Sequence, residues 1–435
     1  MVFFGCFISN LLTTIFCYSL AIVVFASTLN AETTESFNGS SSYQIMVTLD
    51  TLNKELSAST KMLWKNPSDK PVDNLQFHLY YNAFKNSQST FLKESGGFGF
   101  LSRTMEEGCG WGWSEIVSMK DKVGNDLTSG FEFIHPDDDN EEDQTVLKVN
   151  LVNPVEPGEE AYFEFEWKAK IPKTAPRTGY NKDYFYFAQW YPKLGVYETA
   201  GMRYATEDGW NCHQYHSSGE YYGDFADYEV HLVIPKEMSV GSSGQLFNIE
   251  ERDEVTIHSY RVKNVIDFAW TASKHFVVNE EKWENVSIKL LTYPEHEHFA
   301  PRYFKAIKHA FEYMDEHIGR YPYETLTIVS PPIHGVFTGG MEYSTLITSL
   351  STCLLPQGFR TVEGLVVHEF VHQYFQQMVA THEVEEPWMD EGMTSFYEGR
   401  ILDEYYGEKT SAIDFYGFHA GNKEYNRAEY FSSNN

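Results

Sequence analysis

The stretch His368-Glu369-Phe370-Val371-His372 is the most informative part of this sequence. Glu391 follows it after 18 intervening residues. Residues four apart on an α-helix lie on the same face, about one turn from each other. His368 and His372 can therefore present two imidazole nitrogens to one metal ion. The H-E-x-x-H spacing is that of a catalytic zinc site, in which the two histidines bind the ion and the glutamate is a general base.

The residues around the two histidines are mostly apolar, which predicts a buried helix: Leu365, Val367, Phe370, Val371, Phe375 and Met378. Two neutral imidazoles in an apolar setting are costly unless they have partners, and a metal ion would satisfy them. The alternative interpretation is a pair of surface histidines on an amphipathic helix.

Glu391 is the candidate third ligand. An acidic loop over residues 380–387 ends the first helix, and a second helix is predicted from Trp388 onward. Two helices joined by a short loop can pack antiparallel, which would bring Glu391 back over the histidines. Two His and one Glu leave a fourth position for water, whereas a structural zinc site commonly uses four protein ligands, often cysteines. We therefore expect one zinc ion at these three residues, with Glu369 as general base toward water.

The 18-residue gap and the sequence Trp388-Met389-Asp390-Glu391-Gly392 resemble the aminopeptidase N family of zinc metallopeptidases. A second similar element is Gly339-Gly340-Met341-Glu342-Tyr343, in which Glu342 lies 26 residues before His368. The resemblance implies that Glu342 pairs with the free α-ammonium group of a peptide, and that the backbone of Gly339, Gly340 and Met341 binds the peptide as an added strand. Tyr343 stands where the family has Asn. Taken alone, the element would indicate only a turn leading into a strand over 344–350.

Two further family features are matched less closely. The family uses a Gln or Glu from its N-terminal domain in the amine pocket, and Gln189 is the candidate here, with a buried structural amide as the alternative. The family's transition-state tyrosine follows the third ligand by several dozen residues. The sequence stops 44 residues after Glu391, where Tyr425 and Tyr430 are candidates by residue type only. The catalytic domain is therefore expected to be incomplete at its C-terminus.

A chain of 435 residues is too long for one compact core, so at least two domains are expected. Short runs of alternating or aromatic residues separated by turn clusters predict antiparallel β-structure over 32–290. Together with the resemblance, this predicts an α+β multidomain protein. A β-sandwich-like N-terminal domain over 32–290 would precede a thermolysin-like catalytic domain, with a small sheet and helices, over 291–435.

The net charge and the N-terminal segment 1–31 indicate which partners and which cellular location to expect. A net charge of −29 excludes nucleic-acid binding and mildly favours substrates with a positive N-terminus. Residues 1–31 are apolar and uncharged, which predicts a signal peptide and a secreted, extracellular or periplasmic protein, with an uncleaved membrane anchor as the alternative. Outside the leader, a disulfide between Cys109 and Cys212 is possible, with Cys353 left over. The oligomeric state is not indicated.

The predicted function is a zinc-dependent aminopeptidase acting on peptides with a free N-terminus. Two alternatives remain open, a zinc endopeptidase and a truncated, non-catalytic peptide-binding relative. The 18-residue gap and the Gly-Gly-Met-Glu element argue against the endopeptidase.

Overall fold

The first strands of the chain form where buried and half-buried residues alternate. Strand β1 (Ser41–Asp50) alternates over its whole length and pairs antiparallel with β2 (Glu55–Lys65). The hairpin between them is closed by the Asp50 carboxylate, which accepts hydrogen bonds of 2.9 Å from the backbone N–H groups of Leu52 and Asn53. Such local bonds fix the strand register, which keeps the apolar side chains on the core face.

The computed structural model describes residues 39–96, 110–173, 175–219, 221–351 and 356–423. The predicted signal peptide, Cys109, Cys353, Tyr425 and Tyr430 lie outside these ranges. Across the ranges that are described, no helix is both long and apolar enough to cross a membrane.

The N-terminal part is built from β-sheets, as the sequence predicted. A seven-stranded sheet has the order β15 (Gln245–Glu251), β16 (Val255–Val265), β13 (Ala226–Pro235), β1, β2, β7 (Glu160–Lys170) and β4 (Trp113–Asp121). A four-stranded sheet has the order β10 (Lys193–Leu194), β3 (Val72–His78), β6 (Val146–Val155) and β5 (Phe131–Phe133). A third sheet has the order β14 (Ser239–Ser242), β17 (Trp270–Ser273), β9 (Tyr184–Phe187) and β8 (Gly179–Asn181). One buried cluster joins residues of all three sheets, with Trp64, Trp167, Trp190 and Trp270 as its largest side chains.

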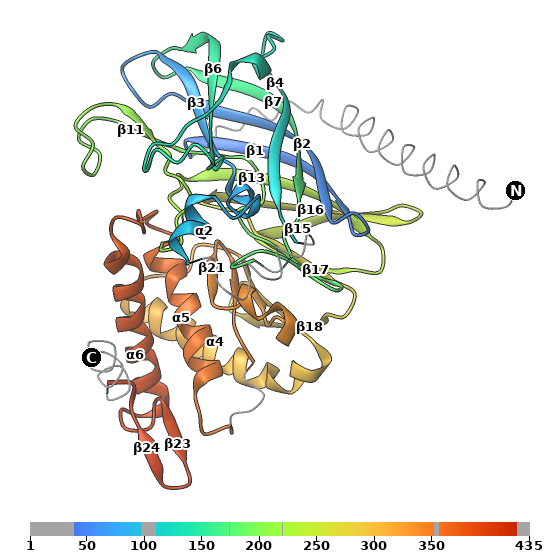
Figure 1. Cartoon of the computed structure of the whole chain (residues 1–435). Coiled ribbons are helices and arrows are strands. Elements are labelled where there is room, and N and C mark those ends of the chain that lie inside the picture. Colours follow the sequence, from blue (N-terminus) through green and yellow to red (C-terminus); the bar gives the residue numbers. More distant parts are fainter. Residues whose placement is uncertain (1–38, 97–109, 174, 220, 352–355, 424–435) are drawn as a thin grey trace, which may run out of the picture. The chain divides into compact units, whose positions relative to one another are not determined.

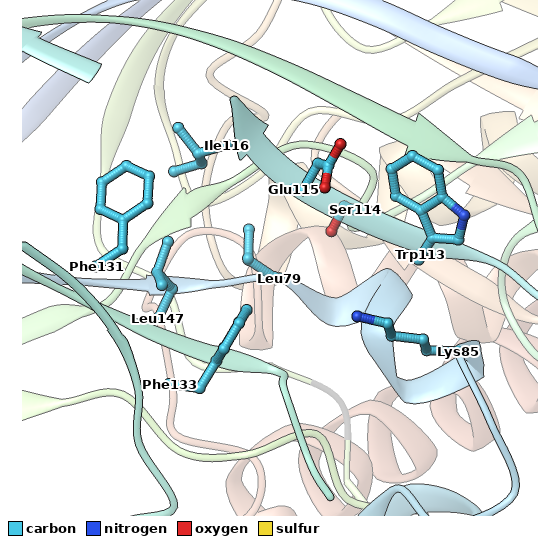
Figure 2. Close-up of a pocket in the computed structure, with 9 residues that line it drawn as sticks. All are labelled: Leu79, Lys85, Trp113, Ser114, Glu115, Ile116, Phe131, Phe133 and Leu147. Atoms are coloured by element: carbon cyan, nitrogen blue, oxygen red, sulfur yellow. The ribbon is translucent and has the colours of Figure 1, made fainter. Parts of the chain in front are cut away.

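A cavity of about 380 Å³ lies at one side of these sheets (Figure 2). Apolar residues of β4, β5 and β6 line it together with Lys85 and Glu115, and none of the predicted site residues belongs to its lining. The cavity is therefore separate from the site described below.

A five-stranded mixed sheet and three helices form the C-terminal part (Figure 1). The sheet has the order β18 (Val277–Trp283), β19 (Val286–Thr292), β20 (Thr325–Val329), β22 (Leu346–Thr348) and β21 (Met341–Tyr343). The helices are α4 (Ala300–His317), α5 (Thr361–Phe375) and α6 (Met393–Tyr406), and a hairpin of β23 (Ile413–Phe415) and β24 (Phe418–Ala420) follows. These elements confirm the predicted α+β class.

The predicted boundary between residues 290 and 291 falls inside β19. Strand β19 pairs in parallel with β20 and antiparallel with β18, so the sheet that carries the site begins at Val277. The division into two domains stays a prediction, but a cut at 290 would separate strands that share hydrogen bonds.

The Gly-Gly-Met-Glu element is more than the turn that its sequence alone indicates. Met341–Tyr343 form β21, and the turn lies at Ser344–Thr345, where Thr345 has φ +57°.

Helix α4 packs its apolar face under the sheet and against α5. Phe311 is fully buried, with its ring 4.7 Å from that of Trp283 and 4.4 Å from that of Phe370. Arg302 adds a bidentate bond to Glu363 of α5, at 2.8 and 2.6 Å. The helix with the two histidines is thus fixed from below by apolar packing and at its start by a half-buried ion pair.

Replacing Phe311 by Ala should lower the free energy of unfolding of this part by about 3–5 kcal/mol, because a cavity would form beneath α5. The measurement is the shift of the chemical denaturation midpoint. Ile318, 43% exposed just beyond the same helix, is the control, and its change to Ala should have little effect. Equal shifts for both variants would contradict the packing described here.

Candidate metal site

Helix α5 presents the two histidines on one face. Val362, Val366, Val367, Phe370 and Val371 are fully buried, so the helix is held by apolar contacts on several sides. His372 is buried and His368 is 19% exposed at the side chain. Their Nε2 atoms lie 3.2 Å apart. The sequence prediction of a buried helix carrying a histidine pair is confirmed for this segment.

Glu391 reaches the histidines from the following element. A π-helical turn, η5 (Trp388–Gly392), leads directly into α6. Glu391 Oε2 lies 3.2 Å from His368 Nε2 and 3.8 Å from His372 Nε2. The second helix is only partly buried, because Met389 and Phe396 are exposed while Ile401 and Leu402 are buried.

Each histidine is oriented by a carboxylate on its other ring nitrogen. His368 Nδ1 donates to Glu398 Oε2 at 3.0 Å, and His372 Nδ1 donates to Asp390 Oδ1. A metal ion that displaces the proton between His368 Nε2 and Glu391 would leave the Nδ1 proton with the carboxylate and would find the Nε2 atom of each ring facing it. Carboxylates in this position fix the tautomer and raise the basicity of a metal-binding histidine.

The surrounding charge favours a cation at this point. Burial by itself lowers the pKa of His368, but hydrogen bonds with Glu391 and Glu398 outweigh it and raise that pKa to about 11. Burial also opposes the charged form of His372, and the bond to Asp390 raises its pKa nonetheless. The hydrogen bond with His368 lowers the pKa of Glu391. A field that holds a proton this strongly also favours a metal cation.

The donor set fits a zinc ion. Three atoms, one from each of His368, His372 and Glu391, lie within 4.8 Å of one another. Two ligands at 2.0–2.1 Å from one ion in a tetrahedral arrangement are separated by roughly 3.3 Å. The observed separations of 3.2, 3.2 and 3.8 Å agree with that value. The assignment of these residues as zinc ligands remains a prediction that the geometry supports.

Glu369 lies beside the Gly-Gly-Met-Glu element. Its carboxylate is buried, and a Cβ atom built on Gly340 would come within 3.6 Å of Glu369 Oε1. Gly340 has φ +73°, which favours glycine, and Gly339 has no room for a side chain because Leu350 lies 2.3 Å from where its Cβ would be. Gly340 therefore lets the backbone approach the base closely, and Gly339 lets it pass Leu350.

Strand β21 holds Glu342 next to the histidines. It pairs antiparallel with β22 and is the last strand of its sheet as far as the chain is described. Glu342 is buried, and its carboxylate lies within 4.8 Å of donor atoms of His372 and Asp390. The structure thus brings together all of the predicted site residues: His368, Glu369, His372, Glu391, Gly339, Gly340, Met341 and Glu342.

Two amide side chains that the sequence interpretation missed tie α5 to β21. Gln373 accepts a bond from Thr345 N at 2.8 Å and donates to Tyr343 O at 3.1 Å. Gln377 accepts a bond from Ser344 Oγ at 2.5 Å. The signal was present, because Glu369, Gln373 and Gln377 recur every four residues, the first two on α5 and the third just after its end.

Gln189 follows strand β9 in the β-rich part. It is buried, has φ +51°, and its Nε2 atom has no hydrogen-bond partner among the residues described. A buried structural amide would be expected to have its donor satisfied. The role of Gln189 in an amine pocket stays a prediction, beside that of a buried structural amide. Cys212 is buried as a free thiol, and its suggested partner Cys109 lies outside the described ranges.

Changing Glu398 to Gln should weaken zinc binding by about 10- to 100-fold, because His368 loses the carboxylate that orients it. Competition with a chromogenic chelator measures the affinity. Glu404 is exposed on the same helix, so Glu404→Gln is the matched control and should bind zinc like the parent protein. An unchanged affinity in Glu398→Gln would show that this carboxylate does not support the site.

Comparison with known proteins finds a family model that matches the segment containing this site. Residues 303–431 match the model of the peptidase family M1 domain. Glutamyl aminopeptidase of Bos taurus is 28% identical over 196 residues, which are 42% of this chain and 20% of that protein. Glutamyl aminopeptidase of Homo sapiens is 28% identical over 185 residues, 40% of this chain and 19% of that protein. The matched region thus spans about a fifth of the length of these curated relatives.

Solved structures share the fold at low identity. A mutant M1 zinc metallopeptidase from Deinococcus radiodurans aligns with a TM-score of 0.54 and 15% identity, over 86% of this chain and 73% of that one. The same enzyme with a Tyr-Ser-Ala substrate aligns with a TM-score of 0.53 and 14% identity, over 85% and 72%. The chain thus shares its fold with these structures, and the segment 303–431, which contains His368, His372 and Glu391, matches the model of the peptidase family M1 domain.

Proposed function

We propose that this protein is a zinc-dependent aminopeptidase that removes N-terminal residues from peptides. The observation that carries the proposal is the placement of the buried Glu342, on an edge strand, within 4.8 Å of donor atoms of His372 and Asp390. An acidic group beside a metal site suits a substrate whose positive N-terminus lies next to the bond to be cleaved. Relatives of the matched segment that bear the name aminopeptidase support the same reaction.

The chain's own residues can perform the steps of peptide hydrolysis. Zinc held by His368, His372 and Glu391 would supply Lewis-acid activation of water and of the scissile carbonyl. Glu369 accepts a proton as water attacks the carbonyl carbon, and returns it to the departing amine as the C–N bond breaks. The charge of Glu369 contributes to the raised pKa of both histidines, so its carboxylate acts at short range on the ligand pair.

Substrate selection rests on the strand beside the base. The backbone of Gly339, Gly340 and Met341 would bind an extended peptide as an added strand through groups not already bonded within the chain, since Gly339 N donates to Val336 O at 3.1 Å and Gly340 N donates to Thr348 O at 3.2 Å. Glu342 then pairs with the α-ammonium group, and Gln189 is a second polar candidate for that pocket. Glu342 would gain an ion pair with a free ammonium group and none with a blocked N-terminus, which selects against blocked N-termini and against chains that continue past the site. We further propose that the protein acts outside the cytoplasm, which its uncharged leader supports.

Changing Glu369 to Gln should reduce kcat by about 10²–10⁴-fold, because the general base is lost. Zinc content should stay unchanged, since Glu369 is not a ligand. Hydrolysis of amino-acid p-nitroanilides by the full chain measures the rate, and elemental analysis measures the metal. A variant that keeps full activity would contradict the assigned role, and loss of activity with loss of zinc would point to a structural effect instead.

The parent protein should cleave amino-acid p-nitroanilides at least about 30-fold better than their N-acetylated forms, in kcat/KM, because Glu342 requires a charged amine. Glu342→Gln should raise KM for the free-amine substrate and narrow that difference. Equal rates on both substrates would favour the endopeptidase alternative. Zinc binding and peptide binding without turnover would favour the non-catalytic one.

A further inference from the structure

The third ligand stands on a turn that is buried on one side only, where Asp390 is fully buried against His372. The side chain of Glu391 is 57% exposed, and its neighbours Trp388 and Met389 are 62% and 38% exposed. The η5 turn has only five residues, and no side chain caps its start. A metal ligand must keep its position within about half an ångström to bind well. Contacts from elsewhere in the chain are therefore needed.

The segment that leads to Glu391 also repels itself. Five carboxylates fall within the nine residues 383–391: Glu383, Glu385, Glu386, Asp390 and Glu391. Like charges this close favour an open, extended loop unless positive or donor groups face them. A cation at the metal site faces only the end of this segment.

The β11–β12 hairpin of the β-rich part supplies those groups. Strands β11 (Val196–Glu198) and β12 (Gly209–Asn211) pair antiparallel, and the loop 199–208 joins them. Arg203 Nη2 donates to Glu385 Oε2 at 3.0 Å, while its Nε donates to Glu198 Oε1 at 2.6 Å. The Tyr204 hydroxyl donates to Glu386 Oε1. Each of these two contacts with the acidic loop joins residues 182 positions apart in sequence.

The hairpin tip is preorganised for these contacts. Gly201 N donates to Ala205 O at 2.8 Å, and Ala205 N donates to Met202 O at 2.9 Å. Arg203 itself has φ +48°. On the other side of the guanidinium, Glu198 is held by the hydroxyl of Tyr222 at 3.0 Å. Arg203 therefore lies between two carboxylates, with the ring of Tyr222 5.0 Å away.

The acidic loop 382–388 makes further contacts beside these two. The ring of His382 lies 4.3 Å from that of Tyr222, and Glu385 N donates to His382 Nδ1 at 3.3 Å. Trp388 Nε1 donates to Glu386 Oε2 at 2.5 Å, which links the Tyr204 contact to the first residue of η5. A continuous set of bonds thus runs from the hairpin tip to the turn that carries Glu391.

We infer that Arg203 and Tyr204 form a clamp that positions Glu391 by holding the acidic loop 382–388. They are positioning residues, since neither touches the ligand atoms. The inference rests on the proposed function in one respect, which is that Glu391 binds zinc. Because the clamp joins the β-rich part to the metal site, the N-terminal sheets would contribute to metal affinity as well as to the walls of the site.

The test compares Arg203→Gln and Tyr204→Phe in the full chain with Arg252→Gln. Arg252 is a matched control, because its side chain is also 20% exposed and its Nε donates to Glu250 Oε1 at 2.9 Å, away from the site. Hydrogen exchange of residues 380–392 in the zinc-free protein reports loop order without any metal. Chelator competition then gives the zinc affinity.

Arg203→Gln should speed exchange across 380–392 and weaken zinc binding by about 10-fold, at the lower end of the effects of outer partners. Tyr204→Phe should do the same to a smaller extent, and its exposed position leaves folding intact. Arg252→Gln should change neither. Unchanged exchange, or faster exchange with unchanged affinity, would overturn the inference. Failure of the parent protein to bind zinc would instead overturn the proposed function, which the parent measurement alone decides.

Discussion

Two imidazole nitrogens and a carboxylate oxygen that face one another within 4 Å need a proton or a metal cation between them. His368, His372 and Glu391 are held at these distances by elements whose own positions are fixed by other contacts. Apolar packing fixes helix α5, and carboxylates on the far side of each ring fix the tautomers. The surrounding fold maintains a cluster of donors whose stability depends on a bound cation.

The charge distribution around this cluster follows the same logic. Glu342, Glu369, Asp390 and Glu398 surround the three donors, so the site is strongly negative before any cation enters. In a protein of net charge −29, that excess must be balanced locally. A divalent ion balances it at the histidines, the substrate's ammonium group would balance it at Glu342, and Arg203 balances it along the acidic loop. The proposed metal binding, substrate selection and loop order would thus be three consequences of one electrostatic constraint.

The sequence was sufficient for the parts of this site that lie on one helix or in one short element. The four-residue spacing of His368 and His372 and the apolar residues between them predicted both the helix and the pair. The Gly-Gly-Met-Glu element could be placed only through its resemblance to a family, because its turn and its strand differ little in local pattern. The division at residue 290 fell within β19, since strand periodicity does not reveal which sheet a strand joins.

Hydrogen-bond partners that are distant along the chain could not be predicted from the sequence. In the sequence, Asp390 and Glu398 look like surface carboxylates. In the structure they bond to His372 and His368. The contacts of Arg203 and Tyr204 join residues 182 positions apart, and no periodicity reports such a pairing. Gln373 and Gln377 are an intermediate case. Their four-residue spacing is visible in the sequence, but the residues that they bond to, Thr345 and Ser344, are not.

The central claim is that three side chains hold one metal ion, and the zinc content of the full chain tests it most directly. Protein stripped with chelator and reloaded with limiting zinc should contain one ion per chain by elemental analysis. Glu391→Ala and His368→Ala should each lose that ion while the β-rich part keeps its fold. A parent protein that takes up no zinc, or that retains it equally well without Glu391, would contradict the account.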